Sequence, residues 1–182
     1  HEDDDRVALL KAIREELGPD AVIVANSNWR KCPRSAPYLN GLFMECSRSY
    51  TRWQWEAFLD TLQWAEQNLR EPRANCLETW WHNARDDLRL MRATTTLSLV
   101  ASDGYCLFAD PNELPSFDHL HDWYPLWDEP LGVPEGPGRK QDDGSWRREF
   151  SGGTVVYNPM YNEQHVPVSF EQPRRSAATG RI

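Results

Sequence analysis

The apolar positions of the first 110 residues follow two alternating periods, which predict helices and strands in turn. Residues 6–17 carry apolar side chains about every 3.6 positions, as an amphipathic helix does. The same period recurs in residues 84–100 and in residues 52–70, where Thr51 and Gln54 have the spacing of a capping box. Four short apolar runs predict buried strands at 21–26, 41–46, 75–79 and 105–108, the first of them covered on both faces.

Short buried strands that alternate with amphipathic helices are typical of an α/β protein with a parallel sheet. After residue 110 the pattern changes. Residues 111–145 are rich in Pro and Gly and predict a long ordered loop. Residues 146–170 predict a β-hairpin, to which 165–170 adds a third antiparallel strand, and residues 171–182 predict a disordered tail.

Composition places the chain among acidic globular domains. It has 182 residues, 40% of them hydrophobic, and a formal net charge of -8. This length can bury a core, and the excess of acids argues against binding to nucleic acid or to an anionic membrane. The chain starts at His1, without Met and without the pattern of a signal peptide. We therefore expect that a segment was removed or that this is a fragment of a longer chain.

The cysteines do not indicate a metal site. No two of them, and no Cys/His pair, have zinc-ligand spacing, and their apolar neighbours predict at least three buried free thiols. The motifs of serine hydrolases, zinc proteases and nucleotide-binding proteins are missing as well, so we expect no metal and no cofactor. The four cysteines are Cys32, Cys46, Cys76 and Cys106.

Tryptophan is unusually frequent. The chain has nine Trp against six Phe and six Tyr. An indole joins a large flat apolar face to one N–H donor, which suits the apolar face and polar rim of a sugar ring. For each Trp taken singly, packing in the core is the alternative explanation.

The candidate chemistry lies where the predicted strands end, because the carboxyl ends of parallel strands form the functional edge of such sheets. Carboxylates there can protonate a leaving oxygen and attack or activate water, while aromatic rings hold a sugar. We predict Glu45 and Glu78 as catalytic residues. Alternatively, Glu45 is a structural carboxylate that caps the next turn or pairs with Arg48 or Arg52. The predicted substrate-binding residues are Asn26, Asn28, Trp29, Trp80, Trp81 and Asp110.

Several runs, taken in order, resemble a known family, the hypothetical glycoside hydrolases with TIM barrels, which are related to polygalactosaminidase-like barrels. The runs that carry this resemblance are Val22–Asn26, Tyr38–Glu45, Ala101–Tyr105, Trp127–Gly132, Trp146–Phe150 and Gly153–Pro159. The resemblance implies that this chain is the C-terminal half of a (β/α)8 barrel with a small antiparallel β appendage. On this mapping residues 1–110 form the half-barrel. Glu45 then ends the sixth strand as the acid/base, and its partner carboxylate lies upstream in the N-terminal half.

Three functions remain open at this point. The first is part of a glycoside hydrolase that acts on a poly- or oligosaccharide, for which a secreted or cell-surface location would fit. The second is a non-catalytic carbohydrate-binding module that uses tryptophan stacking. The third is a structural α/β domain. A half-barrel would leave one edge of a parallel sheet unpaired, so the first function also predicts that the chain needs the N-terminal half of its barrel as a partner.

Overall fold

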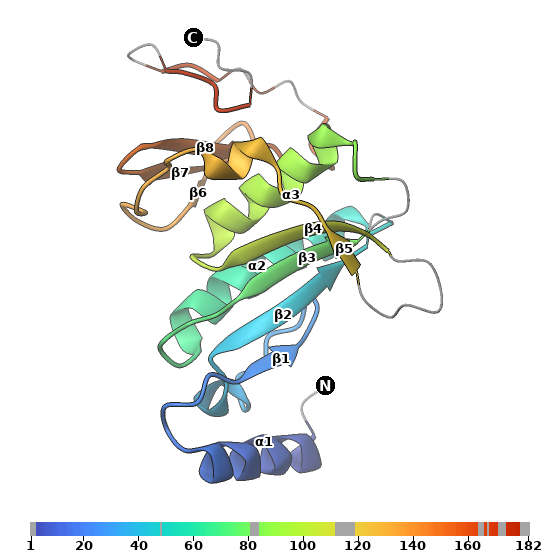
Figure 1. The fold of residues 1–182 in the computed structure, drawn as a ribbon, viewed down its shortest axis with the longest axis vertical. Helices are drawn as coiled ribbons and strands as arrows, with labels where there is room; N and C mark the ends of the chain where they lie inside the picture. Colours follow the sequence, from blue (N-terminus) through green and yellow to red (C-terminus); the bar gives the residue numbers. More distant parts are fainter. Residues whose placement is uncertain are drawn as a thin grey trace.

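The computed structural model describes residues 3–47, 49–80, 84–111, 119–163, 166, 168–170 and 174–178, and leaves the side chains of 80, 109–111, 119 and 120 undescribed. The chain has a mixed α/β architecture in which two long helices lie between a large sheet and a small sheet (Figure 1). The predicted α/β class with a parallel sheet is confirmed.

The large sheet has five strands in the order β1-β2-β3-β4-β5. The first four are β1 (Val24–Asn26), β2 (Gly41–Cys46), β3 (Cys76–Trp80) and β4 (Tyr105–Pro111), and they are parallel. Strand β5 (His119–His121) runs antiparallel to β4 and pairs only with its last three residues. The predicted strands are therefore present, but β1 is shorter than predicted, and β3 and β4 run further.

Each of the three long helices begins directly after its N-cap residue. Helix α1 spans Asp4–Leu17, α2 spans Arg52–Asn68 and α3 spans Leu88–Ala101. The capping box of α2 is present, with the Thr51 hydroxyl accepting from the backbone N–H of Gln54 and the Gln54 side chain accepting from the N–H of Thr51. Helix α3 starts four residues later than predicted, because the side chain of its N-cap residue accepts the backbone N–H of Leu90.

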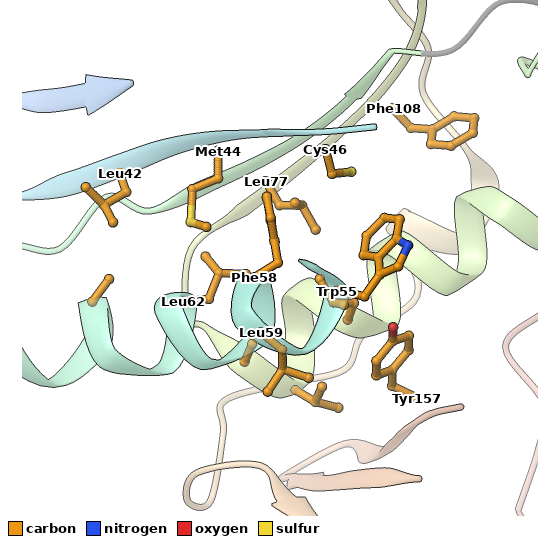
Figure 2. Packing of buried hydrophobic residues seen from close by; sticks show 14 of the residues in the cluster. Leu42, Met44, Cys46, Trp55, Phe58, Leu59, Leu62, Leu77, Phe108 and Tyr157 are labelled. Atoms are coloured by element: carbon orange, nitrogen blue, oxygen red, sulfur yellow. The ribbon is translucent and has the colours of Figure 1, made fainter. Parts of the chain in front are cut away.

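The core lies between the large sheet and helices α2 and α3. Alternate residues of β2 point to α2, as Figure 2 shows for Leu42, Met44 and Cys46. They pack with Phe58 and Leu62, both fully buried. On the far side of the helices, β8 contributes Tyr157 to the same cluster (Figure 2). The helix layer is thus packed on both sides.

The opposite face of the large sheet is partly open in the part of the chain that the structure describes. Val24 of β1 is 42% exposed and Tyr105 of β4 is 68% exposed, while Phe43 and Leu107 are half-buried. The expectation that the first strand is covered on both faces is therefore wrong. Helices α2 and α3 share one face of the sheet, and α1 packs on the short helix η1 (Ala36–Tyr38).

The C-terminal part forms a small antiparallel sheet. It consists of β6 (Arg139–Lys140), β7 (Trp146–Phe150) and β8 (Gly153–Tyr157), so the predicted hairpin is confirmed. Its third strand is β6, whereas the described residues among 165–170 are not in a strand. Pro167 lacks the N–H that a ladder needs, which disfavours a strand there.

Residues 111–145 were expected to be a loop, yet they contribute β5, β6 and the short helix η2 (Pro125–Asp128). Farther along, Arg175 lies in the expected disordered tail and forms an ion pair with Glu129. The segment after β4 is therefore tied to the rest of the fold at several points.

One buried cation joins the small sheet to α3. The guanidinium of Arg148 in β7 donates to the backbone oxygens of Leu99 and Ser102, both at 2.9 Å, and to that of Gly136 at 2.8 Å. It also pairs with the Asp103 carboxylate. These bonds satisfy carbonyl groups at the C-terminal end of α3, which a helix leaves without partners.

Candidate functional site

Four polar side chains come together across the open face of the large sheet. Glu45 and Glu78 are paired residues of the neighbouring parallel strands β2 and β3. Nδ2 of Asn26, from β1, donates to Oε1 of Glu45 over 3.1 Å. On the other side, Nε2 of His121, from β5, lies 2.8 Å from Oε1 of Glu78. We call these four residues the polar row.

Glu45 sits near the carboxyl end of β2 and is half-buried. The Tyr50 hydroxyl donates to the backbone oxygen of Glu45 over 3.1 Å. Burial raises the pKa of the Tyr50 phenol, so this hydroxyl keeps its proton at neutral pH and remains a donor. Arg52, one predicted alternative partner of Glu45, pairs instead with Glu56 at 3.0 Å. The other, Arg48, lies outside the described residues.

Glu78 lies deeper than the sequence predicted. It is only 2% exposed and occupies the middle of β3, because this strand continues to Trp80. A buried carboxylate needs hydrogen-bonding partners, and the imidazole of His121 supplies one. The polar row therefore has a half-buried acid, Glu45, beside a fully buried acid, Glu78, whose carboxylate contacts His121 of β5.

The row also borders a neutral thiol. Burial, with a smaller contribution from the Glu78 carboxylate, raises the pKa of Cys76 to about 11, so that this thiol carries no charge at neutral pH. All four cysteines are free, and three of them are buried, as predicted. The Cys76 side chain therefore adds no negative charge beside Glu78.

The other predicted site residues are less closely gathered. Asn28 is exposed beyond the end of β1. Trp80 and Asp110 belong to β3 and β4 instead of following them, and their backbones pair with Ala109 and Leu120. Trp81 lies outside the described residues. The apolar pattern ended these two strands one and three residues too early, which is why both residues were placed past the strand ends.

Trp29 belongs to a group of rings at the carboxyl ends of β1 and β2. Its ring centroid is 5.1 Å from that of Tyr50 and 6.3 Å from that of Trp53, both in edge-to-face geometry. We call Trp29, Tyr50 and Trp53 the rim aromatic cluster. Most other described indoles support the packing alternative, since Trp55 is buried and three are half-buried against the core. These three are Trp64, Trp127 and Trp146.

Sequence reasoning missed His121 and the position of Trp53. His121 lies in β5, a three-residue strand within the segment interpreted as a loop. Three residues are too few to show a strand period, so the sequence held no usable signal for this contact. Trp53 could have been found, because the capping box at Thr51 puts it in the first turn of α2, near the end of β2.

Two hollows lie elsewhere on the molecule. One, of about 310 Å³, is lined by Glu66, Asp103 and Arg148 among others, near the C-terminal end of α3. The other, of about 270 Å³, is lined by Arg52 and Tyr161 with the turn between β6 and β7. Glu45 and Glu78 line neither of them. The polar row therefore lies on an open sheet face, apart from both hollows.

No protein-family model matches this sequence, and a search of curated proteins finds no relative. Within the described ranges, no three His, Cys, Asp or Glu side chains are grouped as metal ligands. Over the same ranges, no helix has both the length and the apolar character that crossing a membrane requires. The case for a function therefore rests on the geometry of the polar row and its surroundings.

Proposed function

We propose that the polar row belongs to the active site of a glycoside hydrolase that acts on a poly- or oligosaccharide. Glu45 is the general acid/base and Glu78 is the second carboxylate. The observation that carries this proposal is the pairing of Glu45 with Glu78 on one face of a parallel sheet, with Asn26 and His121 hydrogen-bonded to them. Two carboxyl groups on either side of one glycosidic bond are what this chemistry requires.

We further propose that the reaction is retaining. Retaining enzymes hold their two carboxyl groups about 5–5.5 Å apart, and Glu45 and Glu78 are paired residues on neighbouring strands, whose backbones lie about 4.8 Å apart. In such a reaction Glu45 gives its proton to the leaving oxygen while a Glu78 oxygen bonds to the anomeric carbon. Water then attacks that carbon, its proton passes to Glu45, and the bond to Glu78 breaks.

The open face supports a further part of the proposal, that four more parallel strands complete an eight-stranded barrel. β1 is an edge strand. At the other side of the sheet, β5 pairs with residues 109–111 of β4, and among the described residues no strand except β3 pairs with Tyr105–Phe108. Closing the barrel would cover Val24 and Tyr105 and would bring further side chains to the mouth where Glu45 lies.

If this chain is half of a barrel, its open sheet edges should make isolated chains associate with one another, because an unpaired strand edge is a template for pairing with another chain. We expect size-exclusion chromatography of the isolated chain to show association that grows with concentration. Val24→Lys, which places a charge on the edge strand, should reduce it without lowering the unfolding temperature. A well-folded, cooperatively melting monomer at every concentration would count against the barrel.

The catalytic part is tested by Glu45→Gln, which keeps the shape of the side chain and removes its acid. With the N-terminal half of the proposed barrel supplied, we expect turnover on a panel of soluble polysaccharides, measured by reducing-end detection, to fall about a hundredfold or more, since a general acid/base contributes at least that. Glu15→Gln on α1 is the matched control, because Glu15 is exposed and forms an ion pair with Lys11 on the same helix.

Two results would contradict the assignment. One is undiminished turnover in the Glu45→Gln protein. The other is a wild-type protein, with that half supplied, that binds a glycan on the panel and cleaves none, which would indicate a non-catalytic carbohydrate-binding module instead.

A further inference from the structure

Trp53 is a large apolar side chain that the fold leaves in water. It lies in the first turn of α2 and is 61% exposed. An apolar ring exposed to this extent leaves much of its surface in water, and a ligand that covers this surface gains free energy. Trp53 is not part of the polar row, and the proposed reaction gives it no role.

Trp53 is nevertheless braced. Its ring meets that of Trp29, which meets Tyr50, and Tyr50 lies 5.5 Å, between ring centroids, from Trp55 and 6.2 Å from Phe58. Trp55 and Phe58 belong to the buried core. A chain of ring contacts therefore runs from the core to the exposed indole, and a preorganised ring loses little entropy when a ligand stacks on it.

The same chain of rings leads to the polar row. Tyr50, which contacts Trp29, donates its hydroxyl to the backbone oxygen of Glu45. Trp29 follows β1 three residues after Asn26, the hydrogen-bonding partner of the Glu45 carboxylate. The exposed indole and the candidate acid are thus held by one set of contacts, at the carboxyl ends of β1 and β2.

The charges around the cluster indicate the kind of sugar. Arg52, the residue before Trp53 in the chain, pairs with Glu56 at 3.0 Å, and Lys31, two residues after Trp29, pairs with Asp60 at 2.7 Å. Both of these cations therefore already face a carboxylate, while Arg30, the residue after Trp29, is exposed. Glu45 and Glu78 add acidic groups to the neighbouring face, which disfavours a sugar that carries its own carboxylate.

We propose that Trp53, supported by Trp29, is a stacking platform for a neutral hexose unit of the glycan, bound beside Glu45. This inference rests on the proposed function, because it names the class of substrate for the same site. It adds a binding residue and a preference that the carboxylate pair alone does not require.

The test is a binding measurement with the full chain. Isothermal titration with neutral hexose oligosaccharides, with galacturonate oligosaccharides as the acidic counterpart, compares the wild type with Trp53→Ala, Trp53→Phe and Trp123→Ala. Trp123 is the matched control: it is 70% exposed, also meets another ring edge-on, and lies two residues before η2, whose Trp127 bonds to Thr95 of α3.

We expect at least one neutral oligosaccharide to bind more tightly than the acidic one. Trp53→Ala should weaken this binding about tenfold, a factor in the range of one aromatic stacking contact. Trp53→Phe should retain most of the affinity, and Trp123→Ala should match the wild type.

The inference is overturned if Trp53→Ala binds as tightly as the wild type, if the acidic oligosaccharide binds best, or if no oligosaccharide on the panel binds. The hydrolysis assay with Glu45→Gln judges the proposed function separately. Glu45→Gln should still bind the neutral sugar, so loss of turnover with intact binding separates the acid from the platform.

Discussion

Replacing Arg148 with methionine is expected to lower the free energy of unfolding by about 4 kcal/mol, which is a large share of the stability of a domain of this size. The guanidinium is buried and donates to three backbone oxygens, those of Leu99, Ser102 and Gly136. Methionine keeps much of the volume but offers no donor, so these carbonyl groups would be left without their protein partner. Urea unfolding followed by circular dichroism measures the difference.

Arg147→Met is the matched control for this experiment. Arg147 is the preceding residue of β7, and its guanidinium pairs with Glu149 at the surface. Surface ion pairs contribute about 0–1 kcal/mol, so this variant should remain close to the wild type. Equal stability of the two variants would contradict the view that Arg148 fastens the small sheet to α3.

The second large effect is expected from Phe58→Ala, with a loss of about 4 kcal/mol. Phe58 is fully buried in α2 and lies among Met44, Leu77 and Leu62 in the core between sheet and helix (Figure 2). Removing the ring leaves a cavity that the surrounding strands and helices can close only in part. Thermal unfolding measured by calorimetry checks the size of the loss.

Phe58→Leu gives the control, because a volume closer to that of Phe should cost less than about 1.5 kcal/mol. Phe58 also connects the core to the rim aromatic cluster. Phe58 touches the ring of Tyr50, which donates to Glu45. A Phe58→Ala protein that is as stable as the wild type would mean that this part of the core rearranges to fill the space.

The helices and parallel strands were predictable because their patterns are local. The period of apolar residues and the Thr51–Gln54 capping box specify α2 within its own segment. The open face was not predictable in this way. The β-branched run at 21–26 has the composition of a strand covered on both faces, yet Val24 is exposed, since coverage depends on where distant helices pack.

The candidate site was predictable only in part, for the same reason. Strand order and register bring Glu45 and Glu78 to one face, and the sequence pattern had already placed both near strand ends. Glu78 is buried at the middle of β3, which lies between β2 and β4, and its contact with His121 depends on a short strand that pairs with the end of β4. Neither property is encoded in a local period.

The helix layer is packed against a sheet on both sides, and this limits which of its residues can change during evolution. Eight of the 14 residues of α3 are buried, whereas α1, also 14 residues long, buries only Arg14. Most side chains introduced on α1 would face water, while most of those introduced on α3 would face one of the two sheets. Neutral drift therefore has much more room on the first helix of this protein than on its third.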